Sequence, residues 1–163
     1  MDIKFVAKQI SDISRKEVNL LYYSSEELEK ALAEGRAVYF EENGKLAAFG
    51  AWSKRADCAE LHALYIYPEF RGKGYLRKIF QKLYEAAKQK GIKVAYFFTQ
   101  APEVVHVAGD YGFKPTSHAS LPNGVFGEII WHRIHPKRWF SYLKYLSRPA
   151  KLFGFKVYIA ERI

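Results

Sequence analysis

The chain has 163 residues, a formal net charge of +9, 49% hydrophobic residues and 17% aromatic residues. A chain of this length can bury one good core and is most simply one domain. It has no apolar run near the roughly 18 residues needed to span a bilayer, no basic-then-apolar leader and a single cysteine, Cys58. We therefore expect a cytoplasmic protein without an internal disulfide, in which Cys58 is a small core residue.

The first quarter of the chain predicts one strand and two helices. Residues 2–7 alternate apolar and polar side chains, which is typical of a strand. Ser11 or Asp12 can cap a helix that reaches about residue 23. A second helix is expected from Ser24 or Ser25 to a glycine at position 35, because glutamates fill its first turn.

A hairpin and a strand–turn–helix unit follow. Residues 37–41 and 45–53 predict two strands, joined through an Asn-Gly turn. Residues 59–67 are β-branched, aromatic and aliphatic and predict a strand that stops before a proline. Residues 74–90 repeat apolar side chains with helical spacing and predict an amphipathic helix that a glycine closes.

The rest of the chain predicts strands around one short helix. Residues 94–99 are almost wholly apolar, which is typical of a strand inside a sheet. Residues from 102 to about 111 predict the short helix, and residues 114–121 and 125–134 predict two more strands. The resulting order is β-α-α-β-β-β-α-β-α-β-β. It predicts an α/β (α+β) fold in which a mixed, mostly antiparallel sheet is flanked by helices.

The C-terminal region predicts a helix and a strand beyond this unit. We expect a domain over residues 1–134 and a basic, aromatic extension over residues 135–163, with a helix starting at Pro136, a stop at Pro149 and a strand at 156–161. The extension could dock on the domain or on a partner, for instance as a homodimer contact. Its alternating basic and aromatic residues also fit a surface that binds single-stranded nucleic acid.

The charge is unevenly distributed along the chain. Residues 1–67 hold nine Lys/Arg and eleven Asp/Glu, whereas residues 68–163 hold seventeen and six. This asymmetry favours anionic partners for the C-terminal side, such as phosphates, nucleic acid or an acidic membrane.

The turn before the amphipathic helix carries the sharpest motif. Its residues are Arg71, Gly72, Lys73, Gly74, Tyr75 and Leu76. Free backbone N–H groups and the dipole at a helix N-terminus form an anion site, which basic side chains reinforce. The turn lacks the spacing of a P-loop and the third glycine of a dinucleotide-binding loop. The pattern indicates phosphate binding.

This turn resembles the acyl-CoA-binding motif of the GNAT superfamily of N-acyltransferases, written R/Q-x-x-G-x-G/A. Five of the six positions are compatible, and Leu76 replaces the expected small residue. Leu76 either continues the apolar stripe of the helix or narrows the turn. Gly112-Phe113 resembles the family's second signature. The motif match covers residues 58–113, and the expected order of elements fits residues 1 to about 134.

The resemblance implies an N-acetyltransferase that uses acetyl-CoA as co-substrate and a primary amine of a small molecule or peptide as acceptor, without a metal. It implies that backbone groups of Leu64, Tyr65 and Ile66 hold the pantetheine. It also implies that the amides of Arg71 to Leu76 take the pyrophosphate. Preorganised donors and proximity of this kind can supply most of the rate enhancement.

The resemblance also suggests catalytic side chains. Glu60 stands where several members place a general base; otherwise it is a surface carboxylate at a strand end. His62, two residues on, either relays the proton or is simply a hydrogen-bonded histidine. The family's usual acid and asparagine positions are Ala108 and Ala101 here, so Tyr111 and His106 are the substitute acids.

Two alternatives to an enzyme stay open. One is a protein that binds acyl-CoA without turnover, and the other is a basic nucleic-acid-binding module. For an enzyme, the glutamates at 26, 27, 41 and 42 predict a cationic acceptor, because in the family their region borders the acceptor cleft.

Overall fold

The computed structural model describes residues 1–17, 20, 22–55, 57–117, 120–122, 125, 127 and 156–161. Its elements in chain order are α1 (Ile3–Lys16), α2 (Ser25–Ala33), β1 (Ala37–Glu42), β2 (Lys45–Arg55), β3 (Cys58–Ile66), the 3-10 turn η1 (Pro68–Phe70), α3 (Tyr75–Gln89), β4 (Val94–Thr99), α4 (Pro102–Gly109), β5 (Lys114–Thr116) and β6 (Lys156–Glu161).

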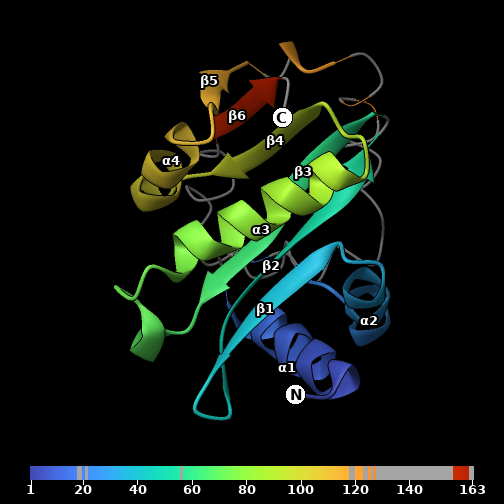
Figure 1. The fold of residues 1–163 in the computed structure, drawn as a ribbon, viewed down its shortest axis with the longest axis vertical. Helices are drawn as coiled ribbons and strands as arrows, with labels where there is room; N and C mark the ends of the chain where they lie inside the picture. The colour runs from blue at the N-terminus through green and yellow to red at the C-terminus, as the bar shows by residue number, and fades with distance from the viewer. Residues whose placement is uncertain are drawn as a thin grey trace.

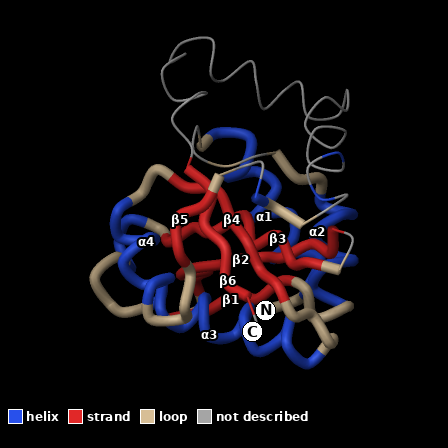
Figure 2. The backbone as a smooth tube through the Cα atoms, turned by 90° about the horizontal axis from the view of Figure 1, so that it is seen from above, coloured by secondary structure: helices blue, strands red, loops and turns tan. Residues whose placement is uncertain are grey.

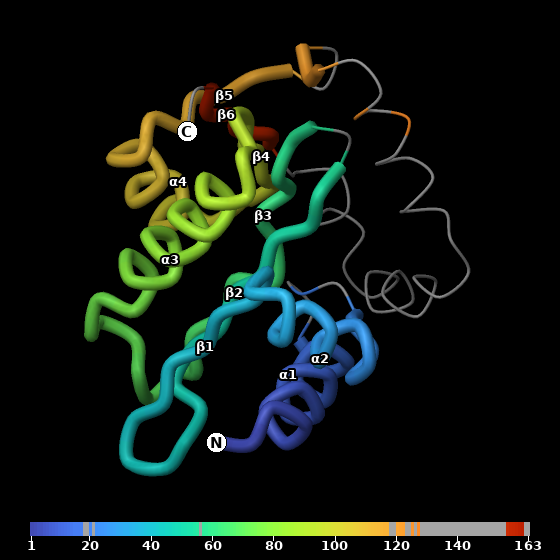
Figure 3. Tube along the Cα trace, turned by 45° about the vertical axis from the view of Figure 1, so that its right-hand side comes forward, coloured from blue at the N-terminus to red at the C-terminus, as the bar shows by residue number. Residues whose placement is uncertain are grey.

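These strands form one sheet in the order β1-β2-β3-β4-β6-β5 (Figure 1). Neighbouring strands in it are antiparallel except β3 and β4, which are parallel. Figure 3 shows α3 and α4 on one side of the sheet and α1 and α2 on the other. Seen from above in Figure 2, the strands form the middle of the molecule and the helices surround them. The predicted mixed, mostly antiparallel sheet flanked by helices is confirmed.

The predicted first strand at residues 2–7 is wrong, because these residues begin α1. The buried side chains of α1 include Val6, Ala7 and Ile10, which share one helical face, whereas Ile3 and Phe5 are 42% and 52% exposed. The alternation of apolar and polar side chains at residues 2–7 is therefore the margin of the apolar face of α1. The helix that was expected to start at Ser11 or Asp12 instead runs from Ile3 to Lys16.

The predicted local signals between residues 24 and 44 are confirmed. Ser24 caps α2 through a capping box, in which its hydroxyl accepts from the N–H of Glu27 and the Glu27 carboxylate accepts from the N–H of Ser24. The turn between β1 and β2 places Asn43 and Gly44 at φ of 53° and 74°. Both values suit the two-residue hairpin turn that this dipeptide favours.

The last strand of the chain lies inside the sheet, where β6 pairs with β4 on one side and β5 on the other. The predicted strand at 156–161 is thus confirmed. The strand expected over 114–121 covers only Lys114–Thr116. In the range expected as a strand from 125 to 134, the described residues Val125 and Gly127 are helical. The helix expected after Pro136 and the boundary at residue 134 lie outside the described residues.

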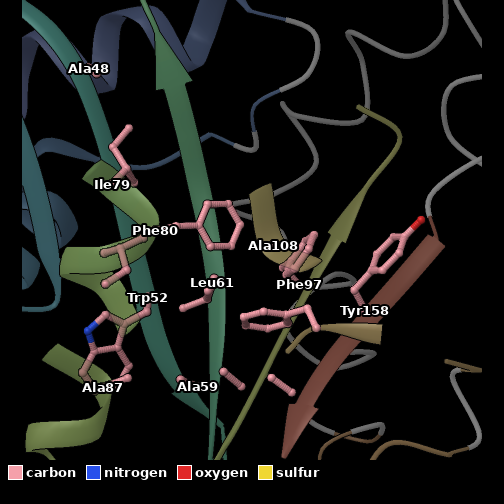
Figure 4. Packing of buried hydrophobic residues seen from close by; sticks show 14 of the residues in the cluster. Ala48, Trp52, Ala59, Leu61, Ile79, Phe80, Ala87, Phe97, Ala108 and Tyr158 are labelled. Atoms are coloured by element: carbon pink, nitrogen blue, oxygen red, sulfur yellow. The ribbon is translucent and has the colours of Figure 1, made fainter. Parts of the chain in front are cut away.

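The main core lies between the sheet and the helices α3 and α4 (Figure 4). Phe97 of β4 packs edge-on against Phe80 of α3 and stacks on Tyr158 of β6, with ring centroids 5.7 and 5.3 Å apart. β6 is therefore part of the same core as α3. In the described part of the chain, no helix is both long and apolar enough to cross a membrane.

Candidate functional site

The ladder between β3 and β4 opens halfway along β3. Their parallel pairing runs from Cys58 opposite Val94 to Leu61 opposite Phe97 and then stops. Two residues later Ala63 has a φ of 54°, and the register with β2 shifts there. A bulge of this kind bends a strand and disrupts its pairing locally. The later residues of β3 therefore pair with β2 alone among the described strands.

The predicted pantetheine positions lie in this opened part of β3. The N–H of Tyr67 donates to Ala47 O of β2 at 3.0 Å. Successive backbone groups of a strand point to opposite edges, so the groups of Tyr65 also face β2 and those of Ile66 face the opening. Ile66 O accepts a hydrogen bond from Arg71 Nε at 3.4 Å. The side chain of Leu64 packs against the main core instead.

The glycine turn follows β3 through η1 and leads into α3. Gly72 and Gly74 have φ of 78° and 77°, a left-handed conformation in which a side chain is strained. Gly74 is the N-cap of α3 and has no side chain to cap this end, and no acidic residue lies in the first turn; among the described residues no side chain is seen to cap it. Its first backbone amides therefore remain available to an anion. Tyr75 is buried and Leu76 packs partly against the core, which fits the expectation that Leu76 continues the apolar stripe.

Glu42 at the end of β1 contacts two residues of this turn. Its Oε1 accepts from Lys73 Nζ at 2.5 Å, and its Oε2 accepts from Tyr75 Oη at 2.6 Å. The hydrogen bond from Lys73 lowers the pKa of Glu42, and the hydrogen bond to Glu42 raises the pKa of Tyr75. The sequence contains both partners but not their pairing, because 31 residues separate Glu42 from Lys73.

Glu60 and His62 lie on either side of Leu61, the last residue of β3 that pairs with β4. Glu60 is only 8% exposed, and its Oε2 accepts from Arg55 Nε of β2 at 3.2 Å. Glu60 is therefore a buried carboxylate in an ion pair, not a surface group. His62 Nε2 lies 2.8 Å from Ser53 Oγ, and the His62 ring stacks on Tyr23 with centroids 4.9 Å apart.

Arg55 and Ser53 contact these two residues but were not predicted from the sequence. Both stand on β2, and Ser53 pairs directly with Glu60 in the ladder. The signal was present in the strand period, because Ser53 and Arg55 alternate with Lys54 and so share one face of the strand. The cross-strand register that brings them to Glu60 is the one that pairs Arg55 with Cys58. The predicted strands ended at residue 53 and began at residue 59, so they did not define it.

The two candidate acids occupy different environments near α4. Tyr111 follows α4, and its hydroxyl donates to Arg77 O in the first turn of α3 at 3.4 Å. Burial raises the pKa of Tyr111. His106 is exposed on α4.

Ala108 is fully buried in the main core. Ala101 is the N-cap residue of α4, and its N–H donates to Thr99 Oγ1 at 3.1 Å.

Three of the four glutamates expected near an acceptor already contact other groups. Glu27 belongs to the capping box of α2, Glu41 forms an ion pair with the N-terminal amine at 3.0 Å, and Glu42 binds Lys73 and Tyr75. Their charge is therefore partly offset within the protein. Over the residues that the structure describes, no group of three or more His, Cys, Asp or Glu side chains forms a potential metal site.

Comparison with known proteins gives one family match. Residues 8–112 match the model of the acetyltransferase (GNAT) family. This range contains the hairpin, the opened ladder, the glycine turn and α4. A search of curated protein sequences finds no match to the chain.

Solved structures share the fold along nearly the whole chain. Rv2747 from Mycobacterium tuberculosis, solved in complex with CoA and a second ligand, superposes with a TM-score of 0.73 at 17% identity, covering 98% of this chain and 96% of its own. YncA from Salmonella typhimurium, a putative acetyltransferase solved with acetyl-CoA, gives 0.64 at 17% identity, covering 99% and 90%. N-acetylglutamate synthase from Neisseria gonorrhoeae, complexed with CoA and N-acetyl-glutamate, gives 0.67 at 17% identity, but this chain spans only 32% of it.

Proposed function

Because the chain belongs to the GNAT family of acetyltransferases, we propose that it transfers the acetyl group of acetyl-CoA to a primary amine. CoA or acetyl-CoA is present in the structures of Rv2747 and YncA, which share its fold. The acceptor in this proposal is a small molecule or a peptide, and the reaction takes place in the cytoplasm.

The observation that carries the proposal is the continuity of the opened ladder and the glycine turn. β3 separates from β4 after Leu61, and the chain reaches the uncapped N-terminus of α3 at Gly74 only thirteen residues later. A long thiol cofactor with a pyrophosphate matches this arrangement. Its phosphates would meet the amides of residues 71–76, while its extended arm would lie along the free edge of β3 at Ile66.

The amine must lose a proton before it can attack the thioester. An alkyl ammonium with a pKa near 10.4 is well under 1% neutral at pH 7. Glu60 is the base in this proposal, because it is a carboxylate next to Leu61, where the pairing of β3 with β4 ends, and a base adds about 10²–10⁴-fold. Arg55 engages Oε2 of Glu60, so the other oxygen is the one assigned to the proton. His62 is assigned a supporting position beside it.

The attack forms a new C–N bond and breaks the C–S bond of the thioester. Backbone N–H groups at the free edge of β3 would stabilise the charge on the carbonyl oxygen. The departing thiolate takes a proton from Tyr111, or from His106 if Tyr111 is not the acid. With a thiol pKa near 8.5, this group leaves easily and needs little help.

Release of free thiol from acetyl-CoA, with amino acids, polyamines, amino sugars and peptides as acceptors, tests this proposal. Amine-dependent release is the expected result. Binding of CoA without release would favour the acyl-CoA-binding alternative. The alanines at positions 108 and 101, where the family usually has an acid and an asparagine, support that alternative. Neither binding nor release, together with salt-sensitive oligonucleotide binding, would favour the nucleic-acid alternative. The basic residues on which that alternative depends lie outside the described residues.

A further inference from the structure

Glu42 and the glycine turn are joined by two short hydrogen bonds although they are far apart in sequence. Lys73 Nζ and Tyr75 Oη donate to the two oxygens of the same carboxylate, at 2.5 and 2.6 Å. Lys73 stands between Gly72 and Gly74, in the middle of the stretch assigned to the pyrophosphate. The contact therefore involves the basic residue that the sequence motif offers to a phosphate.

The hydroxyl of Tyr75 has a fixed position because the rest of the side chain belongs to the core. Tyr75 is 7% exposed, and its ring packs against Phe40 and Phe70 with centroids 5.6 and 6.3 Å away. Glu42 is thus held at the turn by a group that has little freedom to move. Lys73 Nζ also lies 5.1 Å from the centroid of the Phe70 ring, which gives the ammonium a second contact on the same side.

Other cations around the turn also have partners within the protein. Arg71 Nε donates to Ile66 O, Arg77 forms an ion pair with Asp110 at 2.7 Å, and Lys78 Nζ lies 5.0 Å from the centroid of the Tyr75 ring. Of these partners, the Glu42 carboxylate bound by Lys73 is the one that also accepts a hydrogen bond from a tyrosine of the core. The pair of Lys73 with Glu42 remains half-exposed, with 47% and 30% of the two side chains accessible. Such a half-exposed pair contributes little energy, so breaking it should change CoA binding by less than about tenfold.

Building on the proposed function, we propose that Glu42 is a positioning residue that holds Lys73 away from the CoA phosphates and thereby weakens CoA binding. In this arrangement the backbone amides of the turn bind the pyrophosphate, and Glu42 neutralises the charge of Lys73. A carboxylate held beside the turn also opposes the phosphates directly, but the larger effect comes from Lys73. Weaker binding of free CoA favours its release after transfer.

A double-mutant cycle tests this inference by calorimetric titration with CoA. Glu42→Gln keeps the side-chain size and removes the charge, so it frees Lys73 and should tighten CoA binding about fivefold. Lys73→Gln should weaken CoA binding, because it leaves the charge of Glu42 beside the turn without its partner. Glu42→Gln combined with Lys73→Gln should lose most of the fivefold gain. Tyr75→Phe keeps the ring in the core and removes the tether, so it should give a smaller gain of the same sign.

Steady-state kinetics adds a readout that a merely structural role would not move. Glu42→Gln should lower the KM for acetyl-CoA and leave the KM for the amine unchanged, because Glu42 affects only the binding of the phosphates, chiefly through Lys73. Unchanged or weaker CoA binding in Glu42→Gln would overturn the inference, and so would a gain that persists without Lys73. If Glu42→Gln does not fold, the sign of the change in Tyr75→Phe decides. A wild-type protein that does not bind CoA would instead overturn the proposed function.

Discussion

Leu61 and Phe97 form the last pair of the parallel ladder between β3 and β4. The bulge at Ala63 follows at once, so the two strands separate where β3 still has a partner in β2 on its other edge. Among the described strands, the later residues of β3 therefore pair with β2 alone, and the sheet is not interrupted. The same strand leads into the glycine turn, so the part of β3 that does not pair with β4 and the N-terminus of α3 are consecutive parts of one segment.

A negative charge at the N-cap of α3 should weaken CoA binding. We expect Gly74→Asp to raise the Kd for CoA at least tenfold, because a carboxylate would oppose the phosphates. Gly74→Asn is the matched control, since asparagine has the same size and tolerates the φ of 77° equally well. A Cβ at this position meets no atom within 4 Å, so the Cβ of neither variant creates a clash. Equal Kd values for the two variants would place the phosphates elsewhere.

Loss of the Glu60 carboxylate should slow the reaction in a pH-dependent way. We expect Glu60→Gln to lower kcat by about 100-fold or more at neutral pH, because the amine then lacks a base. The loss should shrink at high pH, where the amine is already neutral. A full pH profile of kcat for the wild type and the variant measures this. A variant that keeps its activity at all pH values would show that Glu60 is not the base.

Arg55 provides the control for a purely structural role of Glu60. Glu60→Gln also leaves the guanidinium of Arg55 without its carboxylate, which destabilises a largely buried pair. Arg55→Gln breaks the same pair and keeps the carboxylate. Similar thermal stability of the two variants, with a kcat defect only in Glu60→Gln, would separate catalysis from folding.

The parts of the fold that were predicted correctly depend on local chemistry. The capping box of Ser24 and Glu27, the Asn43-Gly44 turn and the apolar stripe of α3 each involve residues a few positions apart. The error at residues 2–7 has the same origin, because Ile3 and Phe5 mimic the period of a strand over a window too short to contradict it. Only the burial of Ile10 and Ser14 beyond them establishes the helix.

The parts that could not be predicted depend on register between distant segments. β6 lies in the sheet between β4 and β5, and no local sequence pattern predicts which strands it pairs with. Likewise, the pair Glu42–Lys73 joins residues 31 positions apart and follows from the position of α3 over the hairpin. The pair Arg55–Glu60 spans only five positions, but it still follows from the register of β2 with β3. The candidate site was therefore predicted as a list of residues on β3 and the turn. The contacts that hold those residues required the structure.

A side chain at position 50 should disturb the packing of α3 on β2. A Cβ on Gly50 would lie 2.5 Å from Ile79 Cγ2 and 2.9 Å from Leu64 Cδ2. We expect Gly50→Ala to lower the free energy of unfolding by about 1–3 kcal/mol through overpacking. Ile79→Leu removes the branch at Cβ, so it should recover part of the loss in the double variant. Urea unfolding measures both, and an unchanged midpoint in Gly50→Ala would contradict the packing.

Ionisation of Tyr67 should make the protein less stable at high pH. Burial raises the pKa of Tyr67 to about 12, from an ordinary value of 10.0. The folded state therefore holds this proton more tightly than the unfolded state. Its contribution to stability is complete below pH 10 and is lost as the pH rises through 12.

The loss is on the order of 1–2 kcal/mol for a half-buried tyrosine. Tyr67→Phe has no proton to lose, so its free energy of unfolding should fall less steeply between pH 10 and 12. Urea titrations at several pH values in this range give the two slopes. Parallel slopes for the wild type and Tyr67→Phe would show that Tyr67 does not cause the decline.

Tyr111 should supply the proton to the leaving thiolate. Its hydroxyl bonds to Arg77 O at 3.4 Å, a long hydrogen bond that costs little to break. Its ring is held independently, because it stacks on Phe80 and contacts Tyr84 with centroids 6.0 and 5.6 Å away. We expect Tyr111→Phe to keep the fold and the KM for acetyl-CoA and to lower kcat about tenfold or more.

The pH profile and the second candidate acid sharpen this last prediction. Because the pKa of Tyr111 is raised, the acid stays protonated beyond pH 10, and kcat should fall only above that value in the wild type. Tyr111→Phe should lack this alkaline decline. His106→Gln changes an exposed residue of α4 and should keep kcat within about twofold. A kcat defect in His106→Gln but not in Tyr111→Phe would assign the proton to His106, and full activity in both would leave the thiolate to be protonated by water.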